Sequence, residues 1–254
     1  MCFDRVFTID ETVVILVSLS KHPLQGRLQV QGRLQVQGRL QVQGRSQPLD
    51  LQVVNRALAD QDPSAIVQWA LALGEPTVAT TSMGVNAGAT LHAVASLDKQ
   101  VPVVWVDTGF NTADTHRVAK LLVNRLDLNL HTFRPALSAD AIVREFQGVP
   151  TLDEPDAHQR FTQLVKLEPF RRALAALQPT VWISGIRAEE TKHRAQLDIV
   201  TRDPRGMLKV APFFHFSQSQ LERYMTQHGL PTCQHYFDPT KLLPGRECGL
   251  HTAC

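Results

Sequence analysis

Cysteine is scarce in this sequence, which has four in 254 residues, at Cys2, Cys233, Cys248 and Cys254. Their spacing contains neither a Cys-x-x-Cys pair nor the cysteine and histidine pattern of a structural zinc site. The low number and irregular spacing argue against a disulfide scaffold and against a structural metal. We interpret Cys2, Cys233 and Cys254 as structural or incidental residues, although Cys254 is close enough in sequence to pair with Cys248 under oxidation.

Long apolar runs are also missing. The most apolar early run, residues 13–19, is too short to cross a bilayer, which takes roughly 20 residues. It follows Asp4, Asp10 and Glu11 rather than the basic segment that opens a signal peptide. We therefore expect no signal peptide and no membrane span, and hence a cytoplasmic protein with reduced thiols.

A strong net charge is absent, since the formal balance is only +2. Part of that charge is local, because four arginines lie in one tract, residues 24–45, that contains no acid. Without these four arginines the formal net charge of the remaining chain is negative. A weak field of this kind gives no support for a nucleic-acid partner, and we expect none.

The tract at residues 24–45 repeats the hexapeptide Gly-Arg-Leu-Gln-Val-Gln, starting at Gly26, Gly32 and Gly38. So short a period is far below that of a solenoid of helical units. Its glutamine and glycine content and its lack of aromatic residues favour a poorly ordered insertion over a β-type or partner-binding arm. We predict that residues 1–48 form a low-complexity, disordered extension.

From residue 49 onward the pattern is that of a globular α/β domain. Asp62-Pro63-Ser64 supplies a helix start, and apolar residues recur at helical spacing on both sides of it. Short β-rich runs then alternate with helical ones, at residues 77–80, 101–106, 128–133 and 180–184. This alternation predicts a doubly wound, mostly parallel sheet flanked by helices over residues 49–232, followed by a mobile tail over residues 233–254.

In such a sheet the ligand lies beyond the carboxyl ends of the strands, so the loops there are the candidate site. The loop after residues 77–80 contains Ser82, Met83 and Gly84 and enters a helix with one apolar face. Hydroxyls and a glycine at a helix N-terminus suit an anion, because free amides and the helix dipole point at it. An ordinary capped turn explains the same residues equally well.

The next loop begins with Asp107, Thr108 and Gly109. A carboxylate at the end of a strand could accept a hydrogen bond from a ribose hydroxyl or an adenine amine. The same three residues are also common in turns that bind nothing. We predict a nucleotide contact here, with the plain turn as the alternative.

Basic residues follow later in the chain. Arg187 and Arg194 flank the loop after residues 180–184, and their planar guanidinium groups match phosphate and sulfonate oxygens. Lys166 precedes a helix and could reach a phosphate. We predict an anion clamp made of these three side chains, while a solvated charged surface would account for the same pattern.

The last candidate is Cys248, which lies between Arg246 and His251 near the end of the sequence. Cationic neighbours favour the thiolate of an exposed cysteine, and the thiolate is the nucleophilic form. Taken alone, the residue could equally be an unremarkable cysteine of the tail.

Together and in this order, these motifs resemble the adenylyl-sulfate and phosphoadenylyl-sulfate reductase family, which belongs to the adenine nucleotide α-hydrolase-like superfamily. The resemblance covers residues 50–254, and its most specific element is the terminal signature Glu247-Cys248-Gly249-Leu250-His251. The supporting motifs are Ser82-Met83-Gly84, Asp107-Thr108-Gly109-Phe110, Lys166-Leu167-Glu168-Pro169, Gly185-Ile186-Arg187 with Arg194, and His228-Gly229-Leu230-Pro231.

The resemblance implies that Cys248 attacks the sulfur of a sulfonucleotide and forms an enzyme S-sulfocysteine, with Arg246 and His251 in support. A thioredoxin or glutaredoxin thiol then releases sulfite. Substrate binding would fall to Ser82, Met83, Gly84, Asp107, Thr108, Gly109, Lys166, Arg187 and Arg194. The oligomeric state is left open, with a homodimer as one alternative.

Members of the family that hold a four-iron cluster carry two additional cysteine pairs. Here the place of the first pair reads Arg160-Phe161-Thr162-Gln163-Leu164-Val165, and a second pair is absent from the sequence. The resemblance therefore implies a cluster-free enzyme that uses 3′-phosphoadenylyl sulfate. Between Pro231 and Arg246 the chain is shorter than the family pattern, which keeps two alternatives open: a cluster-free adenylyl-sulfate reductase and a nucleotide-binding paralogue without turnover.

A further alternative to the reductase is a ligase of the same superfamily that cleaves ATP and releases pyrophosphate. Such enzymes carry a Ser-Gly-Gly-x-Asp loop. Residues 82–86 read Ser-Met-Gly-Val-Asn, so the second glycine and the acid are both missing. A pyrophosphate cradle is thus less well supported than a sulfonucleotide site.

Overall fold

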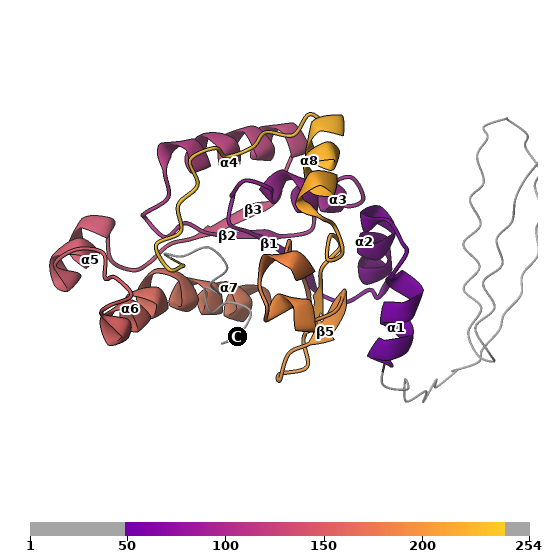
Figure 1. Cartoon of the computed structure of the whole chain (residues 1–254), viewed down its shortest axis with the longest axis horizontal. Helices are drawn as coiled ribbons and strands as arrows, with labels where there is room; N and C mark the ends of the chain where they lie inside the picture. The colour runs from indigo at the N-terminus through magenta and orange to yellow at the C-terminus, as the bar shows by residue number, and fades with distance from the viewer. Residues whose placement is uncertain (1–48, 242–254) are drawn as a thin grey trace, which may run out of the picture. The chain divides into compact units, whose positions relative to one another are not determined.

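The structure is a computed structural model that describes residues 49–241 (Figure 1). The predicted N-terminal extension and most of the predicted tail lie outside this range. So do the residues of those segments that the sequence analysis considered, namely Cys2, Arg246, Glu247, Cys248, His251 and Cys254.

Six strands form one sheet in the order β3-β2-β1-β4-β6-β5. The strands are β1 (Thr77–Thr81), β2 (Val103–Val106), β3 (Leu130–Phe133), β4 (Val181–Ile183), β5 (Val200–Arg202) and β6 (Leu208–Val210). All neighbouring pairs are parallel except β5 and β6, which pair antiparallel. The predicted doubly wound, mostly parallel sheet is confirmed.

The hairpin of β5 and β6 was not predicted from the sequence. Each strand has three residues and contains a basic one, Arg202 or Lys209, so neither stands out as the apolar run that marked the equally short β4. Its turn depends on Asp203, whose carboxylate accepts hydrogen bonds from the amides of Arg205 and Met207, both at 2.9 Å. A buried side chain therefore organises this edge of the sheet.

The helices of the described range lie between and beside the strands. They are α1 (Leu51–Leu58), α2 (Pro63–Ala72), α3 (Ala87–Ala95), α4 (Ala113–Leu126), α5 (Ala139–Phe146), α6 (Pro155–Thr162), α7 (Glu168–Leu177) and α8 (Gln218–Gln227), with a π-helical turn η1 (Gln163–Leu167) joining α6 to α7. The predicted start of α2 is confirmed, because Asp62 accepts from the amide of Ala65 and Pro63 takes the first position. Among residues 49–241 no helix has the length and apolarity needed to cross a membrane.

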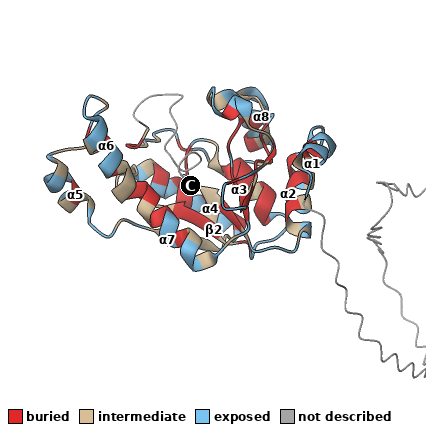
Figure 2. Ribbon diagram, turned by 90° about the horizontal axis from the view of Figure 1, so that it is seen from below, coloured by how far each residue is buried: buried red, intermediate tan, exposed pale blue. Residues whose placement is uncertain are grey.

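Alternating side chains of the central strands enter two different cores. In β2, Val103 and Trp105 join the larger core, while Val104 faces the smaller one. The larger core is covered by helices that include α3 and α4, and the smaller one by Phe170 and Ala173 of α7. Figure 1 shows α4 and α7 on opposite sides of the sheet, and Figure 2 shows that the buried faces of the helices turn toward it. The sheet is therefore buried on both faces, as a parallel sheet must be.

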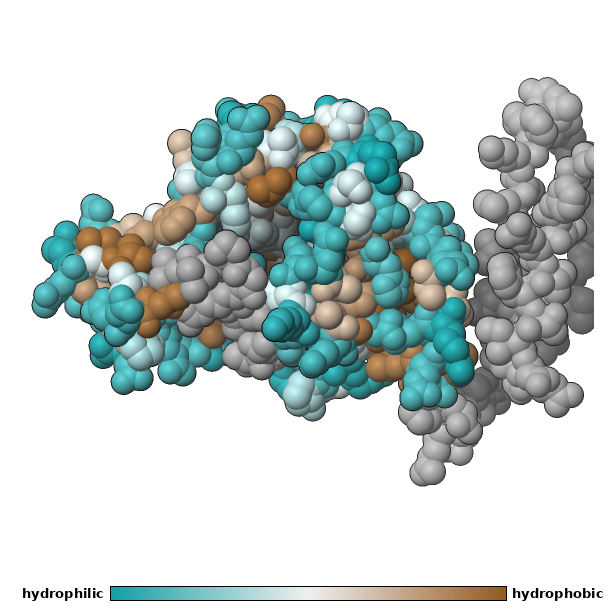
Figure 3. Space-filling view, viewed as in Figure 1, coloured by the Kyte–Doolittle hydropathy of each residue, from teal (hydrophilic) through white to brown (hydrophobic). Residues whose placement is uncertain are grey.

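The surface of the described residues is mainly polar, and Figure 3 shows the apolar side chains as separate patches on the visible face. Two exposed apolar residues, Leu137 and Val143, lie in and beside α5, at 42% and 39% exposure. Apolar surface of this scattered kind is normal for a folded domain.

The segment that begins the predicted tail is part of the folded body up to residue 241. Cys233 is fully buried, with its sulfur 3.5 Å from Oγ1 of Thr115. The carboxylate of Asp114 accepts from the amides of Gln234 and His235, at 2.7 and 3.1 Å. The boundary placed at residue 233 therefore does not coincide with the end of the packed structure.

Candidate active site

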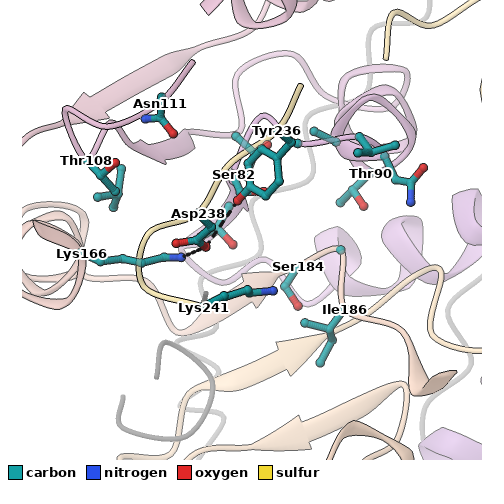
Figure 4. A pocket seen from close by; sticks show the side chains of 18 of the residues that line it. Ser82, Thr90, Thr108, Asn111, Lys166, Ser184, Ile186, Tyr236, Asp238 and Lys241 are labelled. Carbon is teal, nitrogen blue, oxygen red and sulfur yellow. Dashed lines mark hydrogen bonds and ion pairs between the residues drawn. The ribbon is translucent and has the colours of Figure 1, made fainter. Parts of the chain in front are cut away.

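A cavity of about 340 Å³ opens at the carboxyl ends of β1, β2 and β4 (Figure 4). This is the edge at which the sequence predicted the site. The loops after the three strands supply much of its lining, and residues from η1, α7 and the segment after α8 complete it. The site therefore combines residues that lie far apart in the sequence.

The loop after β1 curves around one side of the cavity. Ser82 and Gly84 line it, whereas the side chain of Met83 is fully buried and its backbone adopts a left-handed φ of 52°. Oγ1 of Thr81 accepts from the Met83 amide at 2.9 Å and stabilises the turn. Met83 therefore anchors the loop, and its two neighbours face the cavity.

Gly84 lies at a close approach of two side chains. A Cβ atom at this position would lie 3.3 Å from the ring of Tyr236 and 3.2 Å from Oγ of Ser82. Both Tyr236 and Ser82 line the cavity, as do Asn86 and Ala87 at the start of α3. The predicted combination of hydroxyl, glycine and helix N-terminus is thus present at the cavity, in the arrangement that favours an anion.

The loop after β2 differs from the prediction in one respect, because Thr108 and Asn111 line the cavity but Asp107 and Gly109 do not. The carboxylate of Asp107 accepts from Nε of Arg134 and Nδ2 of Asn111, both at 2.9 Å, and from the Gly109 amide at 3.3 Å. Burial would raise the pKa of Asp107, but these hydrogen bonds outweigh burial and lower it. The carboxylate thus holds the loop together.

Part of the cavity wall is apolar. Val104 and Val106 of β2 and Phe170 of α7 contribute to it. An apolar wall next to polar strand-end groups suits a heterocycle such as a nucleobase. The sequence analysis did not identify these residues, because they read simply as the core of a strand and of a helix.

Lys166 of η1 lines the cavity, and its ammonium has a partner that the sequence did not indicate. Nζ lies 2.5 Å from Oδ2 of Asp238 and 3.3 Å from Oγ1 of Thr240 (Figure 4). Both charged side chains are nearly inaccessible, at 8% and 6% exposure. Burial would raise the pKa of Asp238, but attraction to Lys166 and hydrogen bonds from Lys166 and Thr240 keep it below its ordinary value.

The two predicted arginines have different surroundings. Arg194 lines the cavity and forms an ion pair with Glu190, which lines it as well. Arg187 is not part of the lining. Its guanidinium donates to the carbonyl of Phe216 at 3.1 Å and to Oε1 of Gln218 at 2.8 Å, and so ties the loop after β4 to α8.

The sequence analysis missed the contribution of residues 233–241. Tyr236, Asp238, Pro239 and Lys241 all line the cavity. The one available signal was the cluster of ring and charged residues in this segment, shortly before Cys248. Nothing in that cluster indicates that its acid pairs with a lysine 72 residues earlier in the chain.

The family model of the phosphoadenosine phosphosulfate reductase domain matches residues 76–240, a range that contains the sheet and all the strand-end loops of the cavity. The chain belongs to this family. The match ends before Cys248, so the assignment of that residue depends on the terminal signature of the sequence alone.

Curated relatives of the phosphoadenosine phosphosulfate reductase family agree with this assignment. The phosphoadenosine 5′-phosphosulfate reductase of Synechococcus sp. is 32% identical over 182 residues, which cover 71% of this chain and 78% of the relative. The reductase of that name from Thiocapsa roseopersicina is 32% identical over 226 residues, 79% of this chain and 93% of the relative. A solved structure, phosphoadenylyl-sulfate (PAPS) reductase from Candida auris in a phosphate complex, superimposes with a TM-score of 0.63 at 20% identity, over 72% of this chain and 88% of that one. This last similarity shows the shared fold.

Proposed function

We propose that this chain is a phosphoadenylyl-sulfate reductase. It reduces 3′-phosphoadenylyl sulfate to sulfite and adenosine 3′,5′-bisphosphate, with Cys248 as nucleophile and thioredoxin or glutaredoxin as electron donor. The proposal depends on one observation: in a chain of this family, the residues that line the cavity match the parts of the substrate. An apolar wall of Val104, Val106 and Phe170 suits adenine, and the cations Lys166 and Arg194 suit the anionic groups.

The first chemical step is transfer of the sulfonate group to the protein. The thiolate of Cys248 attacks the sulfur atom, and the bond from sulfur to the bridging oxygen breaks. The electron pair of that bond leaves on the phosphate of adenosine 3′,5′-bisphosphate. Thiolate and sulfonate repel one another, so Lys166 and Arg194 are needed to neutralise the oxygens while the atoms approach.

The second step releases the product. A thiolate of the reduced donor attacks the sulfur of Cys248, and sulfite leaves with the electron pair of the broken bond. The second thiol of the donor then resolves the mixed disulfide, which returns Cys248 to its reduced state. The donor supplies the two electrons that convert the sulfonate group into sulfite. We assign Arg246 and His251 to keeping Cys248 in its thiolate form.

Sulfite release with thioredoxin, measured separately for 3′-phosphoadenylyl sulfate and adenylyl sulfate, tests the proposal. Turnover of the 3′-phosphorylated substrate is the expected result. Preference for adenylyl sulfate would instead identify a cluster-free adenylyl-sulfate reductase. Binding of either nucleotide without sulfite release would identify a non-catalytic paralogue.

Arginine substitutions test the cationic part of the cavity. Arg194→Ala should weaken binding of adenosine 3′,5′-bisphosphate by about 1.5–3 kcal/mol, the usual contribution of hydrogen bonds to charged groups. Arg187→Ala should mainly lower the melting temperature, because the guanidinium of Arg187 donates to Phe216 and Gln218, neither of which lines the cavity. Calorimetry and thermal unfolding of both variants separate the two effects. Equal losses of affinity would mean that Arg187 also contacts the nucleotide.

Iron content is a further expected result. A four-iron cluster needs four thiolates. The chain has four cysteines in total, and one of them, Cys233, is buried with a pKa that burial raises. The purified protein should therefore be colourless, with no stoichiometric iron by elemental analysis. Iron approaching ~4 atoms per chain would contradict this expectation.

A further inference from the structure

The charged side chains that line the cavity do not balance one another. Within the described part of the chain, the basic ones are Lys166, Arg194 and Lys241, and the acidic ones are Glu190 and Asp238. Lys166 pairs with Asp238, and Arg194 pairs with Glu190. Among the residues that the structure describes, no acid lies within ion-pair distance of Lys241. The net positive charge of the cavity lining therefore comes from Lys241.

The backbone of Lys241 is part of the folded structure. Its amide donates to the carbonyl of Asp238 at 3.0 Å, which closes a turn that begins at the buried ion pair. The residue is half-buried, and Figure 4 shows its ammonium pointing toward Ser184 at the end of β4 rather than toward the ion pair of Lys166. The turn thus directs an ammonium without an acidic partner into the cavity.

Two buried hydroxyl groups lie next to Gly185, which follows β4. Ser184 and Thr90 line the cavity, and they are only 2% and 5% exposed. A Cβ atom at Gly185 would lie 2.9 Å from Oγ1 of Thr90, so the glycine leaves room for this hydroxyl. Within residues 49–241 neither hydroxyl has a hydrogen-bond partner. Buried hydroxyls in folded proteins are normally hydrogen-bonded, so their partner is expected in the cavity.

We propose that Lys241 is a further substrate-binding residue: together with the hydroxyl of Ser184, it binds a phosphate group of the nucleotide at the end of β4. The inference rests on the nucleotide-binding part of the proposed function. An ammonium and a hydroxyl both donate hydrogen bonds to phosphate oxygens.

Lys241 differs from the other two cations of the cavity in what binding costs. Lys166 and Arg194 can bind an anion only by sharing a charge that an acid already partly neutralises. Lys241 has no such competitor among the described residues. A phosphate monoester carries about −1.5 to −2 charges at neutral pH, so an ammonium without an acidic partner attracts it most strongly.

Lys241→Met is the test, in the full-length protein, because methionine keeps an unbranched side chain and removes the charge. Calorimetry should show about 10- to 100-fold weaker binding of adenosine 3′,5′-bisphosphate, the effect of losing a hydrogen bond to a charged group. Affinity for adenosine, which has no phosphate, should be unchanged. Lys241→Arg keeps the charge and should retain most of the affinity for the bisphosphate.

Adenosine 5′-monophosphate identifies which phosphate is bound. A loss for the bisphosphate without a loss for the monophosphate assigns Lys241 to the 3′-phosphate, and so to the choice between the two sulfonucleotides. A comparable loss for both ligands assigns Lys241 to the 5′-phosphate. Ser184→Ala should weaken the same ligands by a smaller factor, because its hydroxyl is neutral.

Lys192→Met is the matched control. Lys192 lies in the loop after β4 and is exposed, but it is not part of the cavity lining. The substitution removes the same charge from a loop that lines the cavity at other positions. Its affinity for the bisphosphate should therefore equal that of the wild type.

Three results would overturn the inference. Unchanged affinity of Lys241→Met for the bisphosphate would remove Lys241 from the site. An equal loss in Lys192→Met would make the effect one of overall charge. A loss for adenosine as large as that for the bisphosphate would assign Lys241 to the packing of the site, which thermal unfolding of the variant would show independently.

Failure of the proposed function is distinguishable from failure of this inference. A wild-type protein that binds the bisphosphate but releases no sulfite would reject the proposed reaction and leave the role of Lys241 in binding open to the same calorimetric test. An active wild type whose Lys241→Met variant binds the bisphosphate normally would reject the inference alone.

Discussion

Cys248→Ser should abolish sulfite release while leaving nucleotide affinity within about twofold of the wild type. Serine supplies no comparable nucleophile at neutral pH, because its hydroxyl stays protonated where a thiol can ionise. The cations that we assign to nucleotide binding, Lys166 and Arg194, lie elsewhere in the chain and are untouched by the change. Sulfite assays and calorimetry with adenosine 3′,5′-bisphosphate measure the two effects separately.

The covalent intermediate allows a direct test of Cys248 as the nucleophile. Wild-type protein incubated with substrate but without thioredoxin should gain one sulfonate group on the peptide that contains Cys248, and added thioredoxin should remove it. Cys233→Ser is the matched control and should still form the adduct. Cys233 is buried beside Thr115, and burial raises the pKa of its thiol, which disfavours the nucleophilic form. An adduct on Cys233 or Cys254 would refute the mechanism.

Lys166→Met should have the largest effect on stability among the substitutions considered. It leaves the Asp238 carboxylate at 6% exposure without its cation, and breaking a buried ion pair from one side costs about 3–5 kcal/mol. The variant should also bind nucleotide more weakly, because a cation of the cavity is lost. Urea unfolding measures the first effect and calorimetry measures the second.

Two further variants identify the cause of that loss. Adding Asp238→Asn to Lys166→Met should restore much of the stability, because the unpaired buried charge is gone, but it should not restore affinity. Lys99→Met is the surface control, since Lys99 pairs with Asp127 at 3.5 Å with both side chains mostly exposed, and such pairs contribute about 0–1 kcal/mol. A loss in Lys166→Met no greater than in Lys99→Met would show that the buried pair is not stabilising.

Acid unfolding should show how much the ion pair of Lys166 and Asp238 contributes to stability. The pKa of Asp238 in the folded protein lies below its ordinary value, so the unfolded state binds the proton more readily. The stabilisation is then complete above the unfolded pKa of about 3.9 and is lost as the pH falls through the folded value. The free energy of unfolding of Lys166→Met should accordingly depend less on pH below about 4 than that of the wild type.

Local patterns in the sequence were sufficient for the outline of the fold. The runs at residues 77–80, 101–106, 128–133 and 180–184 became β1, β2, β3 and β4, because strands of a parallel sheet are covered on both faces and appear in the sequence as short runs rich in β-forming residues. The start of α2 could also be predicted, since Asp62 caps a helix that begins at the next residue, Pro63. The strands β5 and β6 were not predicted: each contains a basic residue, Arg202 or Lys209, whereas the equally short β4 is wholly apolar.

For the site, the sequence located the loops but not the direction of each side chain. Arg187 and Arg194 are alike in type and close in sequence, yet one ties the loop to α8 and the other lines the cavity. Asp107 occupies the predicted strand end, but its carboxylate is occupied by Arg134 and Asn111. Which way a polar side chain turns depends on the partners packed around it, and those partners come from other elements.

The sequence by itself determined the family and the parallel sheet and predicted the cysteine on which the proposed chemistry depends, because each is carried by a contiguous motif or run of residues. Only the tertiary structure decided how the cavity is completed: Lys166 meets Asp238 72 residues later, and residues 233–241 become a strap along the cavity. The physical reason is that a buried ion pair is selected by mutual burial and geometry, neither of which leaves a periodic or local trace in the chain.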